Sequence, residues 1–146
     1  MSAFRGQYTY SLDSKGRLAV PARFRKLLDV ESEDTFVVVK GFDHCISVYP
    51  LAEWERKEAV LREQAITNSR TRKVVRTLMA SATETPCDGQ GRILIPPPLI
   101  AWARLEKDVL INGALDRLEL WNPEVFAGYI GDIEETFEEL AEDLIL

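Results

Sequence analysis

A carboxylate and a guanidinium recur four residues apart at two places in the chain, each time with a glycine directly before the arginine. The first set lies in DSKGRLAVP, which runs from Asp13 to Pro21, and the second lies in DGQGRILIP, which runs from Asp88 to Pro96. An aspartate that opens a turn can accept hydrogen bonds from the turn amides and can hold the arginine that ends it. An arginine held in this way can present its fork to guanine O6 and N7, so the chemistry that these residues favour is nucleic-acid binding.

The two sets are copies of one unit. Asp13 and Asp88 stand 75 residues apart in a chain of 146 residues, and both copies have three apolar residues between the arginine and the proline. Half of this chain is too short for a sizeable core of its own. We therefore expect the two halves to bury their apolar faces against each other in one shared core.

Each copy is predicted to form a β-hairpin, a short helix and a second β-hairpin. In the first copy, residues 7–12 and 17–20 form strands around the Asp13–Gly16 turn, and Gly16 is expected to have a positive φ angle. Pro21 opens a short helix that ends at residue 28, and strands follow at 36–39 and 46–49. The second copy repeats this order with strands at 92–95, 109–111 and 118–121 and a helix opened by Pro96 or Pro97 that ends at residue 103.

Helices are predicted in the rest of the chain. One helix starts after Pro50, another is capped by Thr67 or Asn68, and a third starts at Pro123 and is broken at Gly131. A last helix carries an apolar stripe that we expect to pack against its own chain, with a partner subunit as the alternative. The residues of that stripe are Ile133, Phe137, Leu140 and Leu144.

Charge is distributed unevenly along the chain, whose net charge is −6. Residues 1–28 carry six basic side chains and one acidic one, whereas residues 132–146 carry seven acidic side chains and no basic one. This asymmetry indicates an anionic partner at the basic end and either repulsion or a basic partner at the acidic end. A second basic run is expected to be a solvated face or an ion-pair surface for an acidic helix, rather than a DNA contact; it comprises Arg70, Arg72, Lys73 and Arg76.

Several function classes are disfavoured. No acid is tied by a motif to a histidine or cysteine base, and the chain has no G-x-S-x-G motif or phosphate-binding glycine loop, so we expect no enzyme and no cofactor. Cys45 and Cys87 form no CxxC motif and His44 is the only histidine, which argues for reduced thiols and against a zinc site. No stretch has the roughly 20 apolar residues of a membrane span, so we expect a soluble, cytoplasmic protein.

The chain resembles the MraZ family, bacterial regulators built from two swapped-hairpin units of the SpoVT-AbrB type. The resemblance rests on FRG at residues 4–6, YPLAEW at 49–54, ATE at 82–84 and the two D-x-x-G-R copies. It implies an α+β fold in which both halves form one pseudo-twofold β-barrel core with helices outside, a double-split barrel. The implied units are residues 5–52 and 81–124 for the two repeats, 53–80 for connecting helices and 125–146 for an acidic helical region.

The resemblance also implies a nucleoid-associated transcriptional regulator. It would bind double-stranded DNA repeats in the promoter of its own operon, within a division and cell-wall gene cluster, as a homo-oligomeric ring. The alternative is a protein-interaction scaffold or an antitoxin-like module whose charged surfaces bind a protein partner.

Particular residues are expected to carry DNA binding. Lys15 suits a phosphate contact, and Gln90 takes its place in the second loop, so we expect the first loop to dominate. The residues expected to contact DNA are Arg17, Lys15, Arg92, Arg5, Arg23, Arg25 and Gln90, and those expected to organise the loops are Asp13, Gly16, Asp88 and Gly91.

Overall fold

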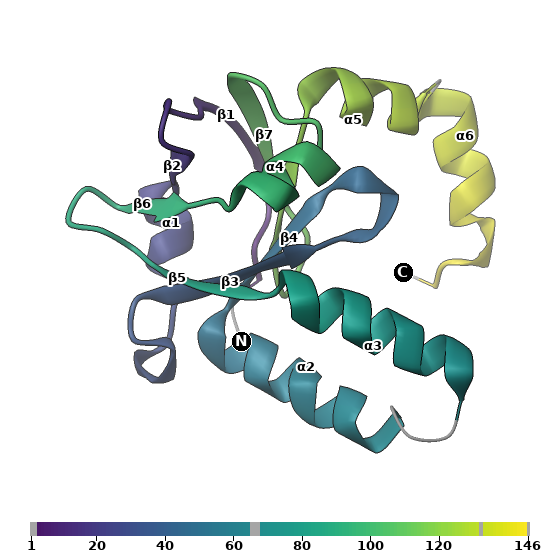
Figure 1. Ribbon diagram of the computed structural model, residues 1–146. Helices are drawn as coiled ribbons and strands as arrows, with labels where there is room; N and C mark the ends of the chain where they lie inside the picture. The colour runs from purple at the N-terminus through teal and green to yellow at the C-terminus, as the bar shows by residue number, and fades with distance from the viewer. Residues whose placement is uncertain (1–2, 65–67, 132, 146) are drawn as a thin grey trace.

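The computed structural model describes residues 3–64, 68–131 and 133–145 (Figure 1). Its strands form a six-stranded sheet in the order β1-β7-β8-β4-β3-β5 and a two-stranded ribbon, β2-β6. The strands are β1 Gln7–Ser11, β2 Arg17–Ala19, β3 Thr35–Lys40, β4 Ile46–Pro50, β5 Thr83–Pro86, β6 Arg92–Leu94, β7 Asp108–Gly113 and β8 Leu118–Trp121. The helices are α1 Ala22–Arg25, α2 Leu51–Gln64, α3 Ser69–Ser81, α4 Pro97–Trp102, α5 Pro123–Ile130 and α6 Ile133–Leu140, with 3₁₀ turns at Val30–Ser32, Phe42–His44 and Ala141–Asp143.

The first predicted hairpin of each copy is wrong as a paired unit. Strand β1 pairs with β7 rather than with β2, and β5 pairs with β3 rather than with β6. The ribbon strands β2 and β6 pair with each other, so each half supplies one strand to the sheet of the other half and one to the ribbon. The predicted hairpins β3-β4 and β7-β8 are confirmed. Leu18 of β2 and Ile93 of β6 are both buried in the common core.

The strand registers show a pseudo-twofold relation between the halves. Leu18 lies opposite Ile93 at the centre of the ribbon, and Ser47 lies opposite Glu119 at the centre of the β4-β8 ladder. Residues on either side of these centres pair reciprocally: Arg17 with Leu94, Ala19 with Arg92, Ile46 with Leu120 and Val48 with Leu118. The predicted α+β fold with one pseudo-twofold core is therefore confirmed.

The core contains side chains from both halves. Leu18, Phe24 and Phe36 from the first half and Ile93 and Ile111 from the second are at most 1% exposed and belong to one cluster. A smaller cluster lies on the opposite face of the six-stranded sheet, where α2 and α3 cover β3 (Figure 1). Its buried members are Val37, Val39 and Trp54. The shared core predicted from the repeat is confirmed.

The helix boundaries follow local chemistry in most places. Asn68 caps α3, since its Oδ1 accepts hydrogen bonds from the N–H groups of Arg70 and Thr71; the alternative cap, Thr67, lies outside the described residues. Helix α1 ends at Arg25, before the predicted residue 28. Gly131 follows α5 with a φ of 62°, a positive angle that glycine adopts more readily than other residues.

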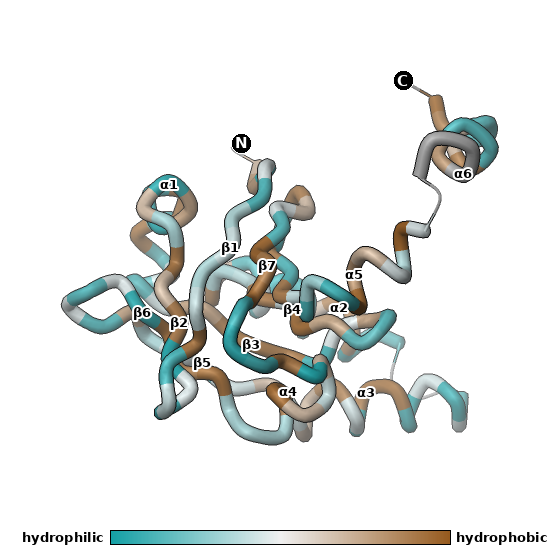
Figure 2. Tube along the Cα trace, turned by 90° about the horizontal axis from the view of Figure 1, so that it is seen from above, coloured by the Kyte–Doolittle hydropathy of each residue, from teal (hydrophilic) through white to brown (hydrophobic). Residues whose placement is uncertain are grey.

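The last helix does not pack as expected. Phe137, Leu140 and Leu144 are 65%, 75% and 63% exposed, so their expected packing against their own chain is wrong. Helix α6 stands away from the sheets and from α2 and α3 (Figure 2). In the described part of the chain, no helix is long and apolar enough to cross a membrane.

Gly113 permits the N-terminal segment to close over the end of β7. A methyl group there would lie 2.5 Å from the backbone nitrogen of Arg5, closer than two such atoms can approach. We expect Gly113→Ala to lower the free energy of unfolding in urea by about 1–3 kcal/mol through this overpacking. Gly128→Ala is the matched control, because a methyl group on Gly128 meets nothing within 4 Å. Equal stability of the two variants would contradict the prediction.

Candidate nucleic-acid interface

The first loop is closed by the carboxylate of Asp13. Its Oδ1 accepts hydrogen bonds from the backbone N–H groups of Lys15 (2.9 Å) and Arg17 (2.8 Å), and its Oδ2 accepts one from Nε of Arg17 (2.8 Å). The backbone closes the same turn, since the N–H of Gly16 donates to the carbonyl of Asp13. Gly16 has a φ of 81°, as the turn chemistry predicts.

The second loop has the same geometry. Oδ1 of Asp88 accepts from the N–H groups of Gln90 and Arg92, and Oδ2 accepts from Nε of Arg92, each at 2.9 Å. Gly91 has a φ of 74°. The three carboxylate hydrogen bonds of one loop differ from those of the other by no more than 0.1 Å, so both arginines are held by the same clamp.

These hydrogen bonds stabilise the ionised carboxylates. The bond from the backbone N–H of Arg17 is the main reason that the pKa of Asp13 falls from 3.8 to about 2, helped by the Arg17 side chain and the N–H of Lys15. The pKa of Asp88 is lowered too, mainly by the backbone N–H of Arg92. Both clamps are therefore charged at neutral pH.

The two loops are joined to each other across the ribbon. The N–H of Val20 donates to the carbonyl of Gly91 (2.9 Å), and the N–H of Ile95 donates to the carbonyl of Gly16 (2.8 Å). These are equivalent bonds under the pseudo-twofold relation. Each glycine therefore has two functions, because it permits its own turn and anchors the other half. Each loop is therefore hydrogen-bonded to the chain segment that follows the other loop.

Arg17 and Arg92 share the outward face of this ribbon. Between them in the ladder, Leu18 and Ile93 point into the core and are at most 1% exposed. Because side chains alternate along a strand, the arginines lie on the opposite face as diagonal neighbours, with Cα atoms about 7–8 Å apart. Their side chains are 35% and 27% exposed. Within the described residues, no hydrogen bond of Arg17 uses Nη1 or Nη2, so the end of its fork can bind a ligand.

Because of the strand exchange, the basic side chain beside the second loop is not one of those that are nearest to it in the sequence. A methyl group on Gly91 would lie 2.6 Å from Cζ of Arg25, whereas one on Gly16 would meet the carbonyl of Ile95 and the side chain of Ile100. Nε of Arg25 donates to the carbonyl of Val20, which fixes the guanidinium there. Arg25 thus lies beside the second loop, although in sequence it is closer to the first. The basicity of the two loops is more equal than the sequence indicated.

Two other candidate cations lie elsewhere. Arg5 precedes β1 and its backbone lies against Gly113, at the end of β1 opposite the first loop. Five strand residues separate the two positions, a span of about 17 Å. The side chain of Arg23 lies at the same end of β1 as Arg5, because its Nη1 is 3.9 Å from the place that a methyl group on Gly6 would occupy. The structure does not bring either side chain to the clamps.

The exposed loop tips are occupied by Lys15 and Gln90. The second basic run lies on α3, which packs against β3 rather than against the loops. Among the described residues, no group of three or more His, Cys, Asp and Glu side chains could hold a metal ion. Burial raises the pKa of the Cys45 thiol to about 12, so this cysteine is protonated at neutral pH. The clamped arginines are therefore the candidate site.

Comparison with known proteins identifies relatives over almost the whole chain. A family model described as "MraZ protein, putative antitoxin-like" matches residues 3–77 and again residues 78–146. A "Transcriptional regulator MraZ" of Halothermothrix orenii is 44% identical over 138 residues, which cover 94% of each chain. Proteins of the same name from Desulfitobacterium hafniense and Thermoanaerobacter pseudethanolicus are 42% and 43% identical, over 97% and 95% of this chain and 96% and 94% of their own.

The lowered pKa of Asp13 predicts how loop stability depends on pH. Because the pKa is lower in the folded chain, the clamp contributes fully above pH 3.8, and this contribution is lost as the pH falls from 3.8 through about 2. We expect carboxyl NMR to give a midpoint of about 2 for Asp13. In Asp13→Asn, the unfolding free energy should depend less on pH between these values. A midpoint at 3.8 would mean that the clamp does not form in solution.

Proposed function

Since the chain belongs to the MraZ family and is a DNA-binding transcriptional regulator rather than an enzyme, we propose that it reads double-stranded DNA through its two clamped loops. The proposal rests on the position of Arg17 and Arg92, which are held by equivalent carboxylate clamps on the outward face of one ribbon. Backbone hydrogen bonds to the carbonyls of Gly16 and Gly91 connect the two loops. A two-stranded ribbon has the dimensions that the major groove admits.

The clamp suits guanine recognition because it fixes an arginine before DNA arrives. Nε of Arg17 is bound to Asp13, which leaves the two terminal nitrogens for the base edge. Contact of an arginine fork with guanine O6 and N7 contributes about 1–3 kcal/mol of discrimination. Ordering the side chain in advance lowers the conformational entropy that is lost on binding. We assign base reading to Arg17 and Arg92.

The neighbouring residues are assigned to the DNA backbone and to a second base contact. Lys15 at the first tip is a compact cation suited to a phosphate, and Arg25 supplies a cation beside the second loop. Gln90 at the second tip can pair with adenine N6 and N7. Arg5 and Arg23 lie too far from the clamps to belong to the same contact.

Several copies are needed for tight binding. A chain of net charge −6 is repelled by DNA outside its basic surface, and one ribbon covers few base pairs. We propose that copies assemble into a ring whose ribbons contact successive DNA repeats, which raises the effective concentration of each contact. Family membership supports this assembly, and it supports targets upstream of a division and cell-wall gene cluster that includes the gene for this chain.

Removal of one clamped arginine should weaken binding strongly. We expect Arg17→Ala and Arg92→Ala each to raise the Kd for DNA from upstream of the gene by at least about tenfold in fluorescence anisotropy, since a bidentate base contact is lost. The two effects should be within about threefold of each other, because Arg25 supports the second loop. Arg62→Ala on α2 removes the same charge from an exposed position and is the control. Unchanged binding by both loop variants would refute the proposal.

Lys15→Ala should change DNA binding in a different way from the two arginine variants. The loss of a phosphate contact weakens binding to all DNA sequences equally and makes the slope of log K against log salt shallower by about one per contact. Titrations of specific and scrambled DNA at several salt concentrations measure both effects. An unchanged slope, or a loss confined to the specific sequence, would assign Lys15 to a base instead.

A further inference from the structure

The outward face of the ribbon carries two apolar side chains beside the clamped arginines. Leu94 pairs with Arg17 in the ladder, and Ala19 pairs with Arg92. Directly paired residues of an antiparallel ladder point to the same face, with Cβ atoms about 4.5–5.5 Å apart. Because the central pair of the ribbon points into the core, Leu94 and Ala19 lie on the outward face together with the arginines.

The backbone of Leu94 is fixed, whereas its side chain is open to solvent. Its N–H donates to Oγ1 of Thr85 (2.9 Å), a residue that is only 3% exposed. Its Cδ1 lies 3.8 Å from the place that a methyl group on Gly16 would occupy, so the side chain stands beside the first loop. Leu94 is nevertheless 53% exposed and is not part of either core cluster. The core therefore does not account for a leucine at this position.

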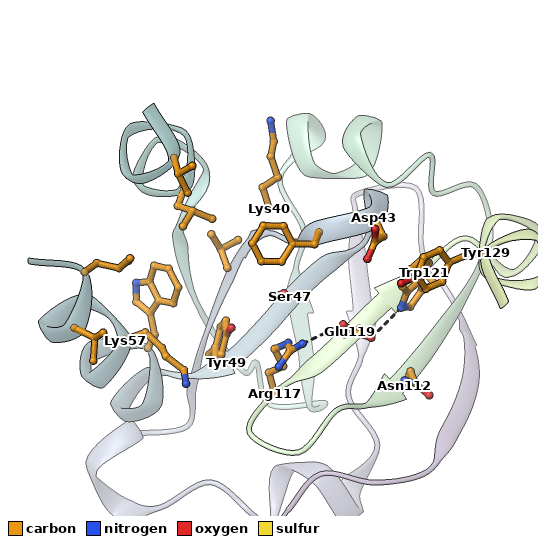
Figure 3. A pocket seen from close by; sticks show the side chains of 18 of the residues that line it. Lys40, Asp43, Ser47, Tyr49, Lys57, Asn112, Arg117, Glu119, Trp121 and Tyr129 are labelled. Carbon is orange, nitrogen blue, oxygen red and sulfur yellow. Dashed lines mark hydrogen bonds and ion pairs between the residues drawn. The ribbon is translucent and has the colours of Figure 1, made fainter. Parts of the chain in front are cut away.

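The place of Leu94 is more informative than its exposure, since single exposed apolar side chains are ordinary on protein surfaces. Val60 on α2 is 52% exposed, and it lines a groove that runs over the six-stranded sheet between α2, α3 and α5 (Figure 3). None of the described residues that line this groove belongs to the ribbon. Leu94, in contrast, lies directly opposite an arginine that we assign to a base.

The major groove of DNA offers one apolar group to such a side chain. All four bases present hydrogen-bonding groups there, and thymine also presents its C5-methyl group. When Arg17 contacts guanine O6 and N7, a side chain about 5 Å away faces the neighbouring base pair, because successive pairs are about 3.4 Å apart. The side chain of Leu94 has no polar atom, so the C5-methyl group is the feature that it can recognise.

The second loop has different neighbours. Ala19 occupies the position equivalent to Leu94, and its side chain is a single methyl group. The guanidinium of Arg25 lies beside this loop, with Cζ 2.6 Å from the place of a methyl group on Gly91. The first arginine thus has a large apolar neighbour, whereas the second loop has a small one and a cation.

We propose that Leu94 recognises the C5-methyl group of a thymine next to the guanine that Arg17 contacts. Ala19 makes no such contact beside Arg92, so the two loops prefer different sequences although their clamps are equivalent. The inference rests on the proposed function and adds a specificity-determining residue to it. The clamped arginines select guanine in both loops, and Leu94 makes the first loop select thymine as well.

DNA that lacks only the thymine methyl groups tests this contact. Amplification of the DNA upstream of the gene with dUTP in place of dTTP removes each C5-methyl group and keeps every base-pairing atom. We expect the unaltered protein to bind the uracil DNA at least about fourfold more weakly in fluorescence anisotropy, the factor that burial of one methyl group contributes. Leu94→Ala removes exposed atoms, should remain folded and should bind both DNAs equally. Leu94→Met keeps a large apolar side chain and should retain the preference for thymine.

Val60→Ala is the matched control, because it shortens a similarly exposed apolar side chain outside the ribbon. Whatever its effect on overall affinity, it should leave the ratio of the two Kd values unchanged. Equal binding of the two DNAs by the unaltered protein, or an undiminished ratio in Leu94→Ala, would overturn the inference and leave the arginine contacts intact. Failure of the proposed function is a separate result, namely unchanged binding by both Arg17→Ala and Arg92→Ala.

Discussion

The pairing of strands between the halves is the constraint on which the rest of the structure depends. Strand β1 finds its partner in β7 and β5 finds its partner in β3, so neither half can complete its sheet alone. The exchange brings β2 and β6 together as a separate ribbon. The Asp13 and Asp88 loops lead into this ribbon, and for that reason they become neighbours. Without the exchange, the two arginines would lie on separate hairpins with no fixed relation.

At the ribbon, the pairing of individual aspartates and arginines matters more than the net charge of the chain. The chain carries a net charge of −6, yet each clamp pairs one arginine with one aspartate and sets its direction. Asp13 binds Nε of Arg17 and the turn amides and leaves the end of that guanidinium available. Arg92 is held through Nε by Asp88, and its Nη1 also lies 3.9 Å from Oδ2 of Asp13. Such exposed ion pairs contribute little to stability. Their effect is to position the side chain, which suits a surface that must recognise a rigid ligand.

The pseudo-twofold symmetry is close in the backbone and broken in the side chains. Arg25 of α1 and Ile100 of α4 occupy equivalent places, yet one gives its loop a cation and the other gives its loop an apolar contact. The C-terminal ends of the halves differ as well, since α2 and α3 cover the sheet while α6 stands away from it. Duplication has thus produced one symmetric ribbon and two dissimilar flanks.

The sequence by itself determined the repeat, which is visible in the order of the residues. It also determined the turns, the aspartate clamps and the positive φ of Gly16, because these depend on residues within five positions of one another. It also indicated a shared core, because half of the chain buries too little apolar surface. Only the tertiary structure decided that β1 pairs with β7, that Arg25 lies beside Gly91 and that Arg5 lies far from the clamps. These facts depend on pairings between residues more than 60 positions apart. Local propensity is the same for a swapped strand and a hairpin strand, so a single sequence cannot distinguish them.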